Sequence, residues 1–214
     1  STFLLGDAAH LTPPFVGQGL GAGLRDAMNL SWKLAGVIGG TLDPAVLDTY
    51  EQERKPHARS MIDLALTVGR AMTSGGRAGD LLRGIVVPWI RLLPGLRKRV
   101  LDSETPALSR GALVQESGRL TGTLCPNPRT PDGRYLDDVL GNGFAIVTSQ
   151  VLSADDRAAA EKRRATVYVA DPDSEIGDWL GEGRATAAII RPDRTVLRAG
   201  RQVSPLLESL GSCS

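Results

Sequence analysis

Residues 3–10 read Phe-Leu-Leu-Gly-Asp-Ala-Ala-His, and residues 13–21 read Pro-Pro-Phe-Val-Gly-Gln-Gly-Leu-Gly. The first segment predicts a short apolar strand that ends at Gly6 and Asp7. The second predicts a loop stiffened by two prolines, followed by the glycine-rich start of a helix. The N–H groups of a helix start have no partner within the helix, and the peptide dipoles add positive potential there. The loop is therefore suited to an electron-rich group, and Asp7 is placed to accept hydrogen bonds from ligand hydroxyls.

The apolar residues that follow this loop predict two long helices. Apolar side chains recur at helical spacing over residues 20–38, and Gly39-Gly40 ends the run. Asp43 is interpreted as a helix N-cap, with Pro44 at the first helical position. The apolar stripe of the second helix then covers residues 47–72.

Pro56 interrupts this second stripe, so we expect either a kink or two abutting helices there. One more helix, bent near Pro88, is expected over residues 79–96. Residues 102–122 are polar and rich in Ser, Gly and Thr, and a domain boundary is predicted within them.

The carboxyl-terminal part changes to short strands. Apolar runs of strand length occupy residues 143–148, 165–170, 186–190 and 195–199. A helix is predicted over residues 154–163, a turn over residues 191–194, and a last helix over residues 205–210. This order predicts a small mixed sheet with helices on its faces.

Composition excludes several classes of protein. The chain has 214 residues and a formal net charge of +1, which gives no reason to expect nucleic acid or a membrane surface as a partner. No apolar run approaches the ~20 residues that span a bilayer. Cys125 and Cys213 form no metal-ligand pattern, and reduced thiols in a cytoplasmic protein are expected.

The opening segments are continued in the same register by residues 25–35 (RDAMNLSWKLA) and residues 50–57 (YEQERKPH). Together they resemble the second FAD-binding motif of the flavin-dependent aromatic hydroxylases, most closely the 3-(3-hydroxyphenyl)propionate hydroxylase branch. The resemblance is close over roughly the first seventy residues and loose beyond. It implies an α+β or α/β chain, with the helical tail of an FAD-binding fold over residues 1–117. A thioredoxin-like domain without redox cysteines is implied over residues 118–214.

The resemblance also implies an activity. These enzymes are FAD- and NAD(P)H-dependent monooxygenases that hydroxylate a phenolic or other small aromatic substrate through a flavin C4a-hydroperoxide. In the family, a dinucleotide-binding βαβ unit precedes this motif, and no G-x-G-x-x-G in that context occurs here. We therefore expect a carboxyl-terminal part that is inactive alone, lacks its amino-terminal partner portion and can self-associate. Two alternatives stay open: a non-catalytic binding or scaffold module derived from such an enzyme, and another FAD-dependent reaction such as epoxidation.

Site residues are carried over from the same resemblance. Asp7 would bind the ribityl hydroxyls, Pro14 would lie beside the isoalloxazine, and the backbone at the helix start would face the pyrimidine edge of the ring. The implied cofactor-binding residues are Gly6, Asp7, Pro14, Gly17, Gly19, Leu20 and Gly21. No catalytic side chain and no metal ligand are implied. The alternatives are that Asp7 only caps a loop and that residues 17–19 are an ordinary helix start.

The remaining polar residues are given structural interpretations. His10 is expected to be packed or bonded within the loop, and His57 to be structural or solvated. Arg25 and Asp26 are expected to form a salt bridge at the helix start. Two carboxylate pairs, Asp137-Asp138 and Asp171-x-Asp173, are interpreted as turn residues without the company that a metal site needs.

Overall fold

The computed structural model describes residues 2–14, 19–73, 106–115 and 118–211. It divides into two compact units. One comprises Ser1–Met28 with Arg54–Pro106, and the other comprises Asn29–Glu53 with Ala107–Ser214. The helix expected over residues 79–96 lies outside the described residues. The domain boundary expected between residues 117 and 118 stays a prediction.

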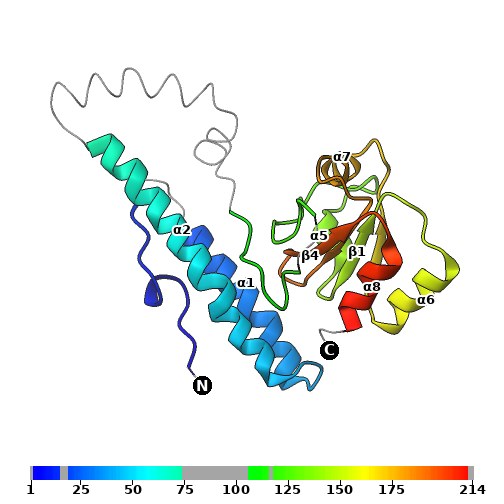
Figure 1. Ribbon diagram of the computed structural model, residues 1–214, viewed down its shortest axis with the longest axis horizontal. Coiled ribbons are helices and arrows are strands. Elements are labelled where there is room, and N and C mark those ends of the chain that lie inside the picture. Colours follow the sequence, from blue (N-terminus) through cyan, green and yellow to red (C-terminus); the bar gives the residue numbers. More distant parts are fainter. Residues whose placement is uncertain (1, 15–18, 74–105, 116–117, 212–214) are drawn as a thin grey trace. The chain divides into compact units, whose positions relative to one another are not determined.

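Both long helices are present (Figure 1). Helix α1 runs over Gly19–Ile38 and helix α2 over Asp48–Thr73. Because α2 continues through Pro56, the alternative of two abutting helices is wrong. A proline inside a helix removes one backbone hydrogen bond, and the turns on both sides of Pro56 remain helical.

The connection between the two helices follows the predicted signals. Gly40 adopts a positive φ of 68°, which glycine reaches without steric cost, and the amides of Thr41 and Leu42 return to the carbonyl of Gly36. The Asp43 side chain then accepts from the Ala45 amide at the start of the 3-10 helix η3, Pro44–Leu47, which leads into α2.

The face that α1 buries is not the apolar stripe that predicts it. Leu20 and Leu24, in the first unit, are 78% and 57% exposed, whereas Asp26 is 1% exposed. Ile38, in the second unit, is 84% exposed, whereas Lys33 is fully buried. A buried charge needs a partner. The packing of this helix is therefore organised by polar contacts as well as by apolar area.

The opening segment is not part of a strand, although the sequence predicts a short apolar strand there. Leu5 has extended backbone angles, but residues 2–5 carry no strand assignment. The 3-10 helix η1, Gly6–Ala8, follows directly. This segment leads directly into the turn.

The carboxyl-terminal sheet has the predicted strands. They are β1 (Ala145–Thr148), β2 (Thr166–Val169), β3 (Ala187–Ile190) and β4 (Val196–Gly200), in the spatial order β2-β1-β3-β4. β1 pairs with β2 in parallel, and the other two pairings are antiparallel. This is the strand order of the thioredoxin fold, as the resemblance implied.

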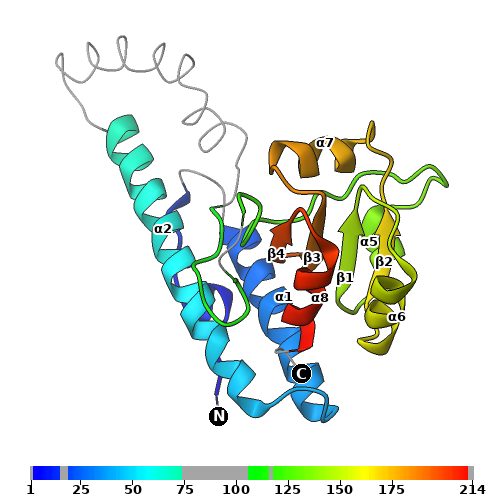
Figure 2. The same ribbon diagram turned by 45° about the vertical axis from the view of Figure 1, so that its right-hand side comes forward.

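Helices cover both faces of the sheet, and Figure 2 shows α6 and α8 together on one of them. Alternate residues of β1 point to opposite sides: Ile146 joins the apolar cluster of α6 (Ala154–Lys162) and α8 (Val203–Gly211), whereas Val147 joins the other cluster. That second cluster contains residues of α5 (Leu136–Leu140) and α7 (Glu175–Glu182).

Helices α5 and α7 were not expected from the sequence. Asp137 and Asp138 occupy the first turn of α5, so their interpretation as turn residues is wrong. A five-residue helix is too short to show apolar periodicity. Asp171 and Asp173 do lie in the turn before α7, where the Ser174 side chain accepts from the Gly177 amide as N-cap.

Candidate functional site

The Gly6–His10 segment forms a tight turn directly after residues 2–5. Gly6 has a positive φ of 52°, and its carbonyl accepts from the amides of Ala9 at 2.8 Å and His10 at 2.9 Å. The Asp7 side chain is exposed. The backbone of this turn therefore presents a carboxylate to the outside of its unit.

This turn lies against the first two turns of α1. A Cβ atom on Gly23 would come within 3.3 Å of the Gly6 Cα, and one on Gly19 would come within 4.0 Å of the Thr12 Cβ. Glycine at positions 6 and 23 lets the two backbones approach each other. The loop that carries Asp7 thus runs alongside the amino-terminal end of α1.

Asp26 on α1 binds both ends of the turn. Its Oδ2 atom accepts from the Gly6 amide at 3.0 Å and lies 2.8 Å from the His10 Nε2, while its Oδ1 accepts from the Arg54 Nε at 2.7 Å. Burial by itself raises the pKa of the Asp26 carboxyl. The hydrogen bonds from Arg54, Gly6 and His10 and the Arg54 charge outweigh burial and hold this pKa below its ordinary value. Asp26 is therefore an ionised carboxylate.

These contacts settle two of the sequence interpretations. The His10 side chain bonds to Asp26 of α1 and not within its own loop, so the packed alternative holds and the loop-bonded one is wrong. The expected salt bridge between Asp26 and Arg25 is wrong, because within the described residues Asp26 pairs with Arg54 of α2. Asp26 also lies in the third turn of α1 rather than at its start.

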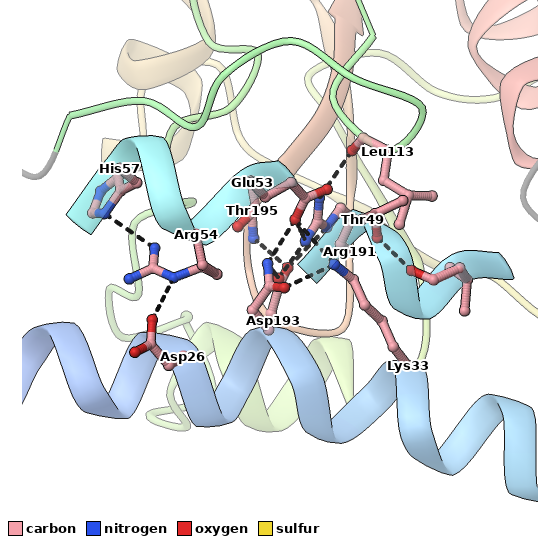
Figure 3. Close-up of polar contacts among 12 residues, drawn as sticks. Asp26, Lys33, Thr49, Glu53, Arg54, His57, Leu113, Arg191, Asp193 and Thr195 are labelled. Carbon is pink, nitrogen blue, oxygen red and sulfur yellow. Dashed lines mark hydrogen bonds and ion pairs between the residues drawn. The ribbon is translucent and has the colours of Figure 1, made fainter. Parts of the chain in front are cut away.

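Arg54 is itself held by a histidine (Figure 3). Its Nη1 lies 3.1 Å from the His57 Nδ1, and the His57 Nε2 lies 3.1 Å from the Pro106 carbonyl oxygen. A guanidinium only donates and a carbonyl only accepts, so the proton of His57 is on Nε2. Burial, followed by the charges of Arg54 and Arg25, lowers the pKa of His57 to about 4. His57 is a neutral structural residue.

A separate buried charge cluster lies in the second unit. Arg191 is fully buried and donates to both carboxylate oxygens of Glu53, at 2.8 and 2.9 Å, and to the Leu113 carbonyl at 3.0 Å. It also forms an ion pair with Asp193. Glu53 accepts from Lys33 at 3.1 Å as well. Figure 3 shows these side chains converging between α2 and the β3–β4 turn.

The electrostatics of this cluster are balanced within it. Burial, assisted by the Arg191 charge, lowers the pKa of Lys33 to about 8 even though Glu53 opposes the shift. Burial alone raises the pKa of the Glu53 carboxyl, but Arg191 and Lys33 bring it below its ordinary value. Burial also lowers the pKa of Arg191, and Asp193 and Glu53 more than restore it. The cluster is a structural ion-pair network.

Trp32 packs against this cluster. The Arg191 guanidinium lies 5.5 Å from the centre of the Trp32 ring, and Phe144 meets the ring edge-on at 5.5 Å. Residues of α1, α2 and the sheet therefore share one buried assembly inside the second unit.

Neither polar network was predicted, although the sequence contains a signal for both. Asp26, Asn29 and Lys33 recur at spacings of three and four, which places them on one face of α1. Asn29 donates to Glu53 at 2.7 Å. A polar stripe at helical spacing, with a Glu-Arg pair on the next helix, was the detectable feature.

Most of the expected cofactor-binding residues fall in the described loop. Asp7, Pro14 and Leu20 are exposed, and Gly19 and Gly21 are partly exposed at the start of α1. Gly17 lies outside the described residues. Within those described, no group of three His, Cys, Asp or Glu side chains could hold a metal ion.

The chemistry of the loop fits one part of FAD, the cofactor that the resemblance implies. An exposed carboxylate can accept from the ribityl hydroxyls, and the first amides of α1 can donate to the electron-rich pyrimidine edge. The close approach of Gly6 and Gly23 is a second fitting feature, because it brings the Asp7 loop next to that helix start.

Cys125 is a buried free thiol. Burial, with the Asp137 charge, raises its pKa to about 12. Cys213 lies outside the described residues. A thiol with so high a pKa is a poor nucleophile, so Cys125 is suited to packing rather than to redox chemistry.

Comparisons with known proteins agree with the sequence resemblance. Residues 1–65 match the family model described as FAD binding domain. The chain is 39% identical to the 3-(3-hydroxy-phenyl)propionate/3-hydroxycinnamic acid hydroxylase 2 of Burkholderia vietnamiensis (strain G4 / LMG 22486), with 90% of this chain and 42% of that protein covered. The corresponding hydroxylase of Burkholderia cenocepacia (strain HI2424) is 40% identical, over the same shares.

A solved structure shares the fold. The OxyS anhydrotetracycline hydroxylase from Streptomyces rimosus superposes with a TM-score of 0.75 at 27% identity, over 99% of this chain and 44% of that one. The chain thus spans less than half the length of the relatives that it matches. None of the described helices is long and apolar enough to cross a membrane.

Proposed function

We propose that this chain is part of a flavin-dependent aromatic hydroxylase, like the relatives that it matches, and that it supplies the ribityl and isoalloxazine side of the FAD site. The whole protein would then hydroxylate a small phenolic substrate with NAD(P)H and oxygen. The observation that carries this proposal is the Asp7 carboxylate, which the Gly6–His10 turn displays alongside the start of α1. Bound FAD supplies the oxygen-transfer chemistry, and the protein supplies binding and electrostatics.

Each residue of the loop has a role in this proposal. Asp7 accepts hydrogen bonds from the ribityl hydroxyls. It thereby fixes the ribityl chain, which joins the isoalloxazine ring to the phosphates. The amides of Gly19, Leu20 and Gly21, at the positive end of α1, stabilise negative charge on the pyrimidine edge. Pro14 limits the conformations of the loop that covers the ring. Gly6 permits the turn, and Gly17 is proposed for the same loop from the resemblance alone.

The dinucleotide half of the site is proposed to come from the portion of the relatives that this chain does not match. In such folds the pyrophosphate sits at a helix start in a βαβ unit. Exposed apolar residues on α1 and its neighbouring loop support a covering portion, namely Leu11, Leu20, Leu24 and Met28. A cytoplasmic location is part of this proposal, supported by the free thiol of Cys125.

A hybrid protein tests the proposal. It joins the amino-terminal portion of the Burkholderia vietnamiensis relative to this chain, and its visible flavin absorption is measured after desalting. We expect a yellow hybrid that consumes NADH faster when 3-(3-hydroxyphenyl)propionate is added. The chain alone should stay colourless, because a few loop contacts must offset an association cost of about 4–15 kcal/mol.

The matched variant is Asp7→Asn in the hybrid. It keeps the size of the side chain but removes the carboxylate, and we expect FAD to bind about 10-fold or more weakly. A hybrid that folds without binding FAD would contradict the proposed function and favour a scaffold role. If this chain by itself binds FAD stoichiometrically, the proposal that the FAD site is shared with an additional amino-terminal portion is contradicted.

A further inference from the structure

Nothing within the described part of the chain holds the Asp7 side chain directly. It is exposed and makes no hydrogen bond or ion pair with another described residue. Its direction therefore depends on the backbone of the turn that carries it. Any residue that fixes that backbone also fixes Asp7.

The turn closes on itself and then on one carboxylate. The amides of Ala9 and His10 return to the Gly6 carbonyl, at 2.8 and 2.9 Å. The Gly6 amide and the His10 ring both reach the same oxygen of Asp26, at 3.0 and 2.8 Å. The first and last residues of the turn are thus tied to one atom on α1.

Asp26 can do this only as an anion in a fixed position. Its side chain is 1% exposed, and its second oxygen accepts from the Arg54 Nε at 2.7 Å. Arg54 is held in turn by the His57 Nδ1 at 3.1 Å and by the Ala22 carbonyl at 3.4 Å. The carboxylate is therefore fixed on one side by a cation from α2, as Figure 3 shows. On the other side it binds the turn.

We propose that Asp26 is the positioning residue of the flavin loop: its carboxylate fixes both ends of the Gly6–His10 turn on α1 and so orients Asp7 toward the ribityl hydroxyls. This inference rests on the proposed function. Asp26 acts through Asp7 and does not itself touch the cofactor.

The first test needs no cofactor. In Asp26→Asn the side chain keeps its shape but gains an N–H group that faces donors, so at least one bond to the turn is lost. Hydrogen exchange of the peptide that spans residues 6–10, followed by mass spectrometry on the FAD-free chain, should be about 10-fold faster or more. Asp63→Asn, on the exposed side of α2, is the matched control and should leave this peptide unchanged.

His10→Ala provides a milder variant, should Asp26→Asn fail to fold. It releases one end of the turn and leaves the pair of Asp26 and Arg54 intact. We expect faster exchange confined to residues 6–10 with an unchanged thermal midpoint, and recovery in His10→Gln, whose amide can still donate. Exchange that stays at the wild-type rate in both Asp26→Asn and His10→Ala would overturn the proposal.

A double-mutant cycle in the hybrid separates positioning from general stability. If Asp26 acts through Asp7, Asp26→Asn weakens FAD binding about 10-fold, and adding Asp7→Asn weakens it little further. If the double variant loses FAD affinity by the full product of the two single-variant losses, Asp26 acts independently of Asp7, and the inference is overturned. A hybrid that binds no FAD at all contradicts the proposed function instead, and the exchange experiment still decides whether Asp26 holds the turn.

Discussion

Arg191 and Glu53 form a two-point ion pair although 138 residues separate them in the sequence. The Arg191 Nη1 and Nη2 atoms donate to the Glu53 Oε1 and Oε2 at 2.8 and 2.9 Å, and both side chains are almost completely buried. A planar guanidinium matches a carboxylate in this geometry. The turn after β3 is thereby bonded to the first turns of α2, within one compact unit.

Breaking this pair should destabilise the chain strongly. Among the described residues, Arg191→Met leaves the buried Glu53 with Lys33 and Asn29 as polar partners. Loss of one member of a buried pair costs about 3–5 kcal/mol. Urea unfolding followed by circular dichroism measures the change. Adding Glu53→Leu should recover part of the loss, because the unpaired carboxylate is removed.

The control for this experiment is an exposed ion pair in the same unit. Asp132 and Arg134 contact each other at 2.7 Å, with side chains 52% and 59% exposed. Solvent screens such a pair, so Asp132→Asn should leave the urea midpoint unchanged. Equal losses in Asp132→Asn and Arg191→Met would refute the importance assigned to burial.

The contacts of Arg191 also predict the stability of the sheet domain when residues 118–214 are expressed alone. Residues 118–214 lack both Glu53 and Leu113, so we expect Arg191 to be solvent-accessible in that segment and to keep its ion pair with Asp193. We expect the isolated segment to fold, with Arg191→Met changing its stability by less than about 1 kcal/mol. The full chain should lose several times more. Equal losses in both would mean that Arg191 stabilises the sheet domain alone.

Local patterns in the sequence account for most of the fold. Gly39-Gly40, Asp43 and Pro44 predicted the turn between α1 and α2, and apolar runs predicted all four strands. These signals work because each depends on the conformation of a few neighbouring residues. Helices α5 and α7, of five and eight residues, escaped because apolar periodicity needs more turns than they have.

The polar networks could not be predicted in the same way. Asp26 was assigned to its neighbour Arg25 because adjacency was the only information available. Its actual partner, Arg54, is 28 residues away and becomes adjacent only when α1 and α2 pack. Likewise, spacing alone does not distinguish a buried polar stripe from a solvated one. The cofactor-binding role of the exposed loop residues, by contrast, comes from a motif alone, and it stays a prediction.

His57 predicts a specific pH dependence. Its pKa is about 4 in the folded chain and about 6.5 when unfolded, so the unfolded chain binds more protons between these values. The free energy of unfolding should therefore be highest above pH 6.5 and decrease as the pH falls toward 4. The total decrease from His57 should be on the order of 3 kcal/mol. Urea midpoints measured across this range should show the fall.

His57→Gln is the matched variant, since its amide can accept from Arg54 and donate to the Pro106 carbonyl without titrating. The variant should be much less sensitive to pH between 6.5 and 4 than the wild-type chain. An identical pH dependence in both proteins would assign the fall to other groups and contradict the role given to His57.

The exposed apolar stripe on α1 predicts self-association of the chain by itself. Leu20, Leu24 and Met28 recur every four residues and are 78%, 57% and 44% exposed, so they form one continuous face within the first unit. Sedimentation velocity at increasing concentration should show dimers or larger species, and Leu24→Lys should shift the chain toward monomer because a charge at this face opposes its burial. Val151→Lys is the control, because Val151 is 82% exposed but lies outside this stripe.

In the hybrid protein the added portion should cover the same face, and Leu24→Lys should then lower the thermal stability of the hybrid. A chain that is monomeric at all concentrations, or a hybrid indifferent to Leu24→Lys, would mean that nothing needs to cover this face.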